Sequence, residues 1–263
     1  NNGATEIQTN VWTPRLNGES DTLPSTALVS SDLQFESPYS NFSLNFDGAT
    51  NYIDVPDKFN FVQTTGIFST SIWLKLDDHT SDDAQAILGT NYTSIYIGFY
   101  LWYDNRSLNS QDRALRFQFA NGSTNQLDNP QAITDNNWHL INVVGDGTTI
   151  KIYKDGVQLS NTLTISGSTS SEGFANLRIG ANNQSPAAFE LNGKLDECAI
   201  FNKELNQAEI SQIYNNGYAA DLTSLSPVSW WRLGEDAYFV GNNITVPNQI
   251  SGAPNGTGAG TQT

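Results

Sequence analysis

Hydrophobic and polar positions alternate with a period of two along most of the chain from residue 43 onward. In FSTSIWLKLDD, Ile72, Leu74 and Leu76 fall on one face of an extended chain, and Trp73 and Lys75 fall on the other. This alternation is typical of strands that bury one face. It returns in SLNFDGATNYIDV, SIYIGFYLWYDN, RALRFQFANG, TIKIYKDGVQL, FANLRIGA and GKLDECAIF. The pattern therefore predicts a succession of short strands.

Turn residues separate these strands, and one segment breaks the alternation. Asp155-Gly156 lies between TIKIY and VQL and suits a two-residue hairpin loop, because such a loop needs positive φ at both positions. In NQAEISQIYNNG, Asn206 is a good N-cap, and Glu209 stands three residues later as in a capping box. An apolar stripe followed by Gly217 predicts a short helix that ends at this glycine.

Many short strands at near-regular spacing and one late helix predict an all-β fold, a two-sheet antiparallel β-sandwich of the jelly-roll type. The pattern contains no crossover helices between strands, which excludes a parallel α/β fold. Residues 1–41 show little periodicity and contain three prolines, so we expect an extended N-terminal arm. We assign residues 42–225 to the jelly-roll domain. Residues 226–263 form a Trp-rich C-terminal segment that either starts a second repeat or completes a sheet.

Composition narrows the classes of partner. The 263 residues include 27 acidic and 12 basic side chains, which gives a formal net charge of −15. This charge opposes the electrostatic attraction on which binding to nucleic acids and to anionic membranes relies. No apolar run approaches the roughly 20 residues of a membrane-spanning helix, so we expect no membrane insertion. The single cysteine, Cys198, cannot form a disulfide within the chain.

Four segments occur in an order that resembles a known family: SLNFDGATNYIDV, FSTSIWLKLDD, NNWHLINVVGDGTTIKIYKDGVQL and LRIGANNQSPAAFELNGKLDECAIFNKELNQAEISQIYNNG. Over about residues 42–217 they resemble the laminin-G-like branch of the concanavalin-A-like lectin/glucanase superfamily. The most specific part is the closing stretch from Gly193 to Gly217. The two ends, LVSSDLQFESPYSNFSLNFDG and SPVSWWRLGEDAYFVGNNITVPNQISGAPNGTGAG, resemble tandem jelly-roll modules of marine bacteriophage structural proteins.

The resemblance raises the question of catalysis, because the superfamily contains glycoside hydrolases. Retaining glycosidases need two carboxylates about 5 Å apart. In the sandwich-fold glucanases these look like Glu-x-Asp-x-Glu on one strand, a run that this sequence lacks. Asp196 and Glu197 are adjacent, so we expect them to point to opposite faces of their strand. His79 and His139 are far apart, and Cys198 fits a small core residue. We therefore predict that the chain is not an enzyme.

The resemblance also implies a structural Ca²⁺ bound by Asp oxygens and backbone carbonyls between a sheet edge and a loop. Asp47 in the FDG turn and Asp196 in the GKLDE strand occupy the positions to which the resemblance points. Asn248 stands where an Asp is expected in the C-terminal turn, which removes one negative charge. The alternative is that Asp47 only makes hydrogen bonds within its own turn.

Two predicted strands place aromatic and polar side chains together. Tyr96, Tyr100 and Trp102 share one face of a strand, and Arg116 and Gln118 share one face of the next. If these strands pair, the five residues form a platform that binds a saccharide. The opposite face is better suited to the core, because it carries Ile95, Ile97, Phe99 and Leu101. We therefore expect the Tyr and Trp side to be exposed. A protein–protein contact is the alternative, since Tyr and Trp are also favoured at interfaces.

These observations predict a non-catalytic jelly-roll module located on a virion surface or otherwise outside the cell. The first hypothesis is an exposed structural protein of a marine phage, such as a capsid decoration, tail or fibre component. It would pack against copies of itself or other virion proteins and attach to host-surface glycans. The alternative is a secreted or cell-surface carbohydrate-binding adhesin domain, a lectin. A glycoside hydrolase is the third hypothesis. The long extensions at both ends favour the assembly hypothesis.

Overall fold

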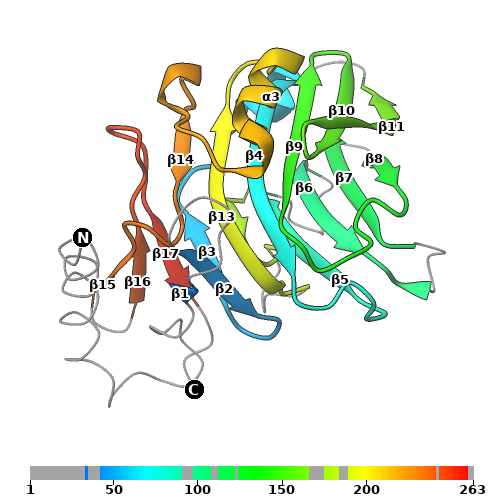
Figure 1. The fold of residues 1–263 in the computed structure, drawn as a ribbon. Helices are drawn as coiled ribbons and strands as arrows, with labels where there is room; N and C mark the ends of the chain where they lie inside the picture. The colour runs from blue at the N-terminus through cyan, green and yellow to red at the C-terminus, as the bar shows by residue number, and fades with distance from the viewer. Residues whose placement is uncertain are drawn as a thin grey trace.

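Two antiparallel sheets face each other and build the fold (Figure 1). A computed structural model describes residues 33–34, 42–90, 97–107, 112–121, 124–165, 175–183, 189–240 and 243–259. We call the two layers sheet A and sheet B. In Figure 1, β4, β9 and β13 lie in the front layer, and β6 and β7 lie in the layer behind it. This arrangement confirms the predicted fold class, an all-β two-sheet sandwich.

Sheet A has the following order: β1 (Leu33–Gln34), β2 (Ser43–Asp47), β13 (Asn192–Phe201), β4 (Ile67–Leu76), β9 (His139–Asp146), β10 (Thr149–Lys154) and β11 (Val157–Thr164). Strand β14 (Ser229–Trp231) also pairs with β13, next to the part of β13 that pairs with β2.

Sheet B has the following order: β15 (Tyr238–Val240), β16 (Asn243–Val246), β17 (Gly256–Ala259), β3 (Tyr52–Val55), β12 (Leu177–Ile179), β5 (Ala84–Gly89), β6 (Ile97–Asp104), β7 (Ala114–Asn121) and β8 (Thr124–Asn129). In the described ranges, the helical segments are α2 (Phe61–Thr65), α3 (Gln207–Tyr214), η3 (Asn215–Gly217) and η4 (Thr223–Leu225). None of the described helices is long and apolar enough to cross a membrane.

The main core lies between the inner faces of the two sheets and contains apolar side chains from both. Phe68 of sheet A stacks on two rings of sheet B, at 6.3 Å from Phe99 and 5.7 Å from Phe117 between ring centroids. All three rings are fully buried. Burying one such side chain contributes about 1.5–3 kcal/mol, so these contacts between the layers are a main source of stability.

The outer face of sheet A is covered by α3 and the segment that follows it. Ile210 and Ile213 of the helix pack on Trp73 and Leu140 of the sheet in a second apolar cluster. The capping box at the helix start is present as expected. The helix ends at Tyr214 rather than at Gly217, because Asn215 adopts the left-handed conformation that terminates it. Much of the outer face of sheet A is therefore a packed apolar surface.

The C-terminal segment contributes strands to both sheets of its own chain. In β14, Trp231 pairs with Cys198 and is fully buried in the main core. Strand β17 pairs with β3 and joins β16 and β15 to sheet B. In Figure 1 these orange and red strands lie beside β2 and β3, which come from the beginning of the domain. Residues 226–240 and 243–259 are thus part of the sandwich.

A bulge in β13 changes the direction of two acidic side chains. The register of β13 against β4 shifts between Asp196 and Ala199, and Glu197 has a φ of 49°. Asp196 lies opposite Trp73 of the outer cluster, and Glu197 accepts a hydrogen bond from Trp230 of the same cluster. Both acids therefore lie on the outer side of sheet A. The expectation that they point to opposite faces is wrong, because a bulge interrupts the alternation.

Candidate functional site

The outer face of sheet B brings together four of the five residues predicted to bind a ligand. Strands β6 and β7 are paired, with Tyr100 opposite Gln118 and Trp102 opposite Arg116. Residues directly opposite each other in an antiparallel pair lie on the same face, about 4.5–5.5 Å apart. The fifth residue, Tyr96, lies outside the described residues.

The two aromatic rings of this group are buried, with exposed fractions of 8% for Tyr100 and 5% for Trp102. The rings stack on each other with centroids 4.7 Å apart, and the Arg116 guanidinium lies 5.0 Å from the Trp102 ring centroid. Phe189, from a distant loop, packs against the cluster that these rings form with Ala84 and Ala86. The expected exposure is therefore wrong. Alternation identifies the outer face of a strand, but it does not reveal that other side chains cover this face.

The carboxylates of Asp104 and Asp128 hold Arg106 and Arg116 in place next to these rings. Nε of Arg116 donates to Asp128 Oδ1 at 2.7 Å, and its Nη1 donates to the buried Asp104. Asp104 also accepts hydrogen bonds from Nε and Nη2 of Arg106, at 2.9 and 2.8 Å. Burial opposes ionisation of Asp104, but the hydrogen bonds from Arg106 and Arg116 outweigh it, so its pKa lies below the ordinary value. The network therefore stays charged and fixed.

Strand β8 adds two polar groups that the sequence analysis missed. Gln126 lies opposite Gln118, and Asp128 lies opposite Arg116. Nε2 of Gln126 donates to both carboxylate oxygens of Asp128 at 2.9 Å, and the Asp128 side chain is 37% exposed. Within the described residues, the half-buried Gln118 amide has no hydrogen-bond partner. In TNQLDN, Gln126 and Asp128 are two residues apart, so they share one face of an extended strand. This alternation is the sequence signal that indicates both residues.

Tyr100, which lies opposite Gln118, carries a buried hydroxyl. Among the described residues, the Tyr100 hydroxyl has no hydrogen-bond partner, although the residue is buried. A buried polar group without a partner is costly, and a water or ligand hydroxyl relieves that cost. We call Gln118, Gln126 and Asp128, with the neighbouring Tyr100 and Arg116, the sheet B polar face.

The two acids expected to bind calcium lie far apart. Asp47 pairs with Asn192, and Asp196 lies four residues further along β13, roughly 13 Å away. The Asp47 carboxylate accepts hydrogen bonds from its own turn: Ala49, Thr50 and Asn51. In the described part of the chain, no group of three or more His, Cys, Asp or Glu side chains could hold a metal ion. Asp47 and Asp196 do not form one site, and calcium binding stays a prediction.

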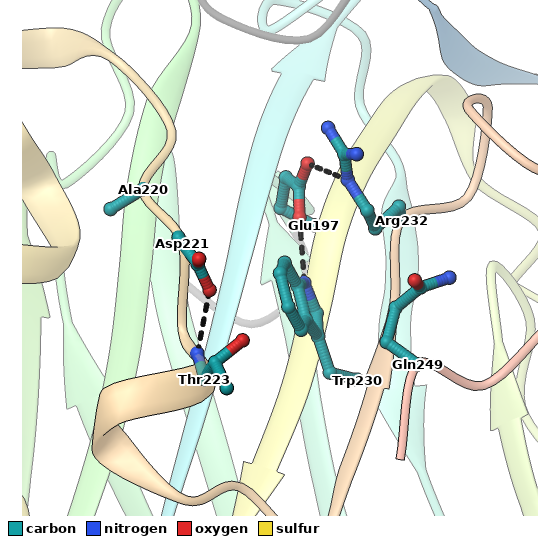
Figure 2. Close-up of a pocket in the computed structure, with 7 residues that line it drawn as sticks. All are labelled: Glu197, Ala220, Asp221, Thr223, Trp230, Arg232 and Gln249. Carbon is teal, nitrogen blue, oxygen red and sulfur yellow. Dashed lines mark hydrogen bonds and ion pairs between the residues drawn. The ribbon is translucent and has the colours of Figure 1, made fainter. Parts of the chain in front are cut away.

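A pocket of about 250 Å³ lies on the other side of the sandwich, at the margin of the surface covered by α3 (Figure 2). Its lining residues come from β13, from the segment after α3, from β14 and the residue after it, and from the turn before β17: Glu197, Ala220, Asp221, Thr223, Trp230, Arg232 and Gln249. Because these segments are far apart in the sequence, no local pattern indicates the pocket.

Glu197 is the central group of this pocket. Its Oε2 accepts a hydrogen bond from Trp230 Nε1 at 2.6 Å, and its Oε1 accepts one from Arg232 Nε at 3.0 Å. Burial raises the pKa of Glu197 above its ordinary value, although the charge of Arg232 and the two hydrogen bonds act in the opposite direction. Both oxygens are therefore engaged in holding Trp230 and Arg232 in place.

The fold defines a concanavalin-A-like jelly roll, and the sequence agrees. The family model of the concanavalin A-like lectin/glucanases superfamily matches residues 47–211, so the chain belongs to this superfamily. No curated protein sequence matches the chain.

Solved structures with low sequence identity share the fold. A proposed carbohydrate-binding protein from Bacteroides ovatus has a TM-score of 0.60 and 16% identity over 82% of this chain. The chain spans 57% of the length of that protein. The IT-sialidase CBM40 of Ruminococcus gnavus has a TM-score of 0.54 and 14% identity, covering 68% of this chain and 100% of the CBM40. The same CBM40 bound to α2,3-sialyllactose has a TM-score of 0.53 and 15% identity, covering 65% of this chain and 96% of that one. At these identities the likeness shows the fold.

Proposed function

We propose that the chain is a non-catalytic carbohydrate-binding module that acts outside the cell and holds a saccharide on the sheet B polar face. The observation that carries this proposal is the adjacent amide and carboxylate groups of Gln118, Gln126 and Asp128. The similar structures support it, because the Bacteroides ovatus protein is described as carbohydrate-binding and the Ruminococcus gnavus CBM40 was solved with sialyllactose.

The chemistry of these groups fits sugar hydroxyls, each of which donates one hydrogen bond and accepts others. An amide offers both a donor and an acceptor, and a carboxylate accepts from neighbouring hydroxyls. Arg116 and Gln126 already hold Asp128 in place, so binding loses less side-chain entropy. Because Tyr100 and Trp102 are buried, the proposed recognition relies on hydrogen bonds rather than on ring stacking.

A glycan array screened with the labelled protein tests the proposal and identifies a saccharide ligand. We then expect Gln118→Ala and Gln126→Ala to weaken its binding about fivefold each, which corresponds to one net hydrogen bond of about 1 kcal/mol. Calorimetric titration of the purified variants measures this loss. Gln212→Ala is the matched control, because Gln212 is an exposed glutamine on α3 and should leave the affinity unchanged. Failure of the wild type to bind any glycan would contradict the proposal.

The virion role expected from the sequence stays a prediction. The long extensions at both ends of the sequence favour this role, because they suggest contacts with neighbouring copies. The C-terminal extension pairs with β13 and β3 of its own chain, so it no longer supports the assembly hypothesis. Light scattering of the purified protein tests self-association directly, because an assembly protein should form particles larger than one chain.

A further inference from the structure

We propose that the pocket around Glu197 is a second saccharide site, which binds a single neutral pyranose ring. This inference goes beyond the proposed function, because the pocket lies on the outer side of sheet A and shares no residue with the sheet B polar face. With both sites, one copy of the chain would carry two saccharides on opposite sides of the sandwich.

The walls of the pocket are fixed by the fold. Figure 2 shows Asp221 and Thr223 on one side, and Trp230, Arg232 and Gln249 on the other. The bulge in β13 turns Glu197 toward the outer side, where it binds both Trp230 and Arg232. A ligand therefore meets preorganised groups, which reduces the entropy lost on binding.

The pocket offers both donors and acceptors that are not used elsewhere. Among the described residues, the terminal nitrogens of Arg232 have no hydrogen-bond partner, whereas the Thr223 side chain is held by Asp221. Oδ1 of Asp221 accepts a hydrogen bond from the backbone N–H of Thr223 at 2.8 Å, and the Thr223 side chain bonds the same carboxylate. The remaining lone pairs of this exposed carboxylate can accept from a ligand. Arginine donors on one wall and a carboxylate acceptor on the other suit the adjacent hydroxyls of a sugar ring.

The size of the pocket favours one ring. Its volume of about 250 Å³ lies below the roughly 300–1,000 Å³ of sites that enclose drug-sized ligands. The indole of Trp230 forms part of the wall, but it is only 8% exposed, so hydrogen bonds rather than ring stacking would hold the pyranose.

Charge favours a neutral ligand over an anionic one. Glu197 offsets the charge of Arg232, whereas Asp221 adds a negative charge to the lining. Glu235 and Asp236 also act electrostatically on Arg232. The surroundings are therefore net negative, and an acidic sugar would be repelled.

Two tryptophan side chains allow the sites to be tested separately by ¹H–¹⁵N NMR. The Trp230 indole N–H donates to Glu197 in the pocket, and the Trp102 indole N–H donates to Asp104 beneath the sheet B polar face. The probes are methyl α-D-glucopyranoside, methyl β-D-galactopyranoside and N-acetylneuraminic acid. We expect at least one neutral pyranoside to shift the Trp230 signal saturably. We expect N-acetylneuraminic acid to leave it unchanged.

Variants of exposed residues then assign the site. We expect Thr223→Val to weaken the response at Trp230 about fivefold and Asp221→Asn about tenfold, since each loses one hydrogen-bonding group. Ser224→Ala is the matched control, because Ser224 is an exposed neighbour that does not line the pocket. A Trp230 signal that neither neutral sugar shifts, or that N-acetylneuraminic acid shifts as strongly, would overturn this inference. A Trp102 signal that none of the three sugars shifts would count against the sheet B proposal only.

Discussion

The same arrangement of side chains occurs on the outer sides of both sheets. On each side one buried carboxylate accepts a tryptophan indole N–H and an arginine N–H: Asp104 with Trp102 and Arg116, and Glu197 with Trp230 and Arg232. A buried carboxylate needs such partners, because desolvation of an unpaired charge costs several kcal/mol. The pairing also fixes each indole and each guanidinium next to a candidate site.

We expect Arg232→Ala to destabilise the protein by about 3 kcal/mol, because it leaves the buried Glu197 without its counter-charge. Urea denaturation followed by tryptophan fluorescence measures the change in the free energy of unfolding. Arg113→Ala is the control, since the side chain of its partner Asp112 is 46% exposed whereas that of Glu197 is only 4% exposed. The control should lose much less stability than Arg232→Ala. Equal losses in the two variants would refute the role given to the Glu197–Arg232 pair.

At the scale of elements, the hairpin between β10 and β11 is tied back to the start of β9. Asp155 and Gly156 both have positive φ, as the sequence predicts for this turn. The Asp155 carboxylate accepts a hydrogen bond from the Leu140 backbone N–H at 2.9 Å and contacts His139 Nδ1 at 2.7 Å. His139 Nε2 lies 3.0 Å from Asp135, so this imidazole sits between two carboxylates.

This arrangement predicts a dependence of stability on pH. Burial favours neutral His139, but the hydrogen bonds and charges of Asp155 and Asp135 outweigh it and raise its pKa above the ordinary 6.5. Protonated His139 therefore stabilises the folded state below that ordinary value, and the contribution is lost as pH rises through the raised pKa. Thermal melts between about pH 6 and pH 9 measure this loss. We expect His139→Gln to flatten the profile and His79→Gln to preserve it. An unchanged slope in His139→Gln would show that another group titrates.

Local patterns predict the strands, the capped helix and the β10–β11 turn, because these depend on residues close in sequence. The pairing of Tyr100 with Gln118 also follows from alternation and strand order. Two features do not follow from alternation. Phe189 packs over the Tyr100 and Trp102 cluster from a distant loop, and a bulge turns Glu197 toward the outer side of sheet A. The place of β14 beside β13 depends on long-range pairing, so the sequence left it open.

At the scale of the whole molecule, the two outer sides of the sandwich differ in character. Much of sheet A is covered by α3 and apolar contacts, whereas sheet B carries polar groups over β6–β8. Residues 226–240 and 243–259 add strands to both sheets, so the sandwich extends beyond the region matched by the family model. The net charge of −15 disfavours nucleic acids and anionic membranes as partners, and it is compatible with the proposed binding of a saccharide to the sheet B polar face.

The most direct test of the proposed function is a ¹H–¹⁵N NMR titration with a saccharide identified on the array, observed at the side-chain amides. We predict that the NH₂ signals of Gln118 and Gln126 shift saturably, because both amides would bond to the ligand. Their assignment follows from the Gln→Ala variants, and the exposed Gln212 signal serves as the internal control. Binding that leaves the Gln118 and Gln126 signals unchanged would contradict the proposal that the sheet B polar face holds the saccharide.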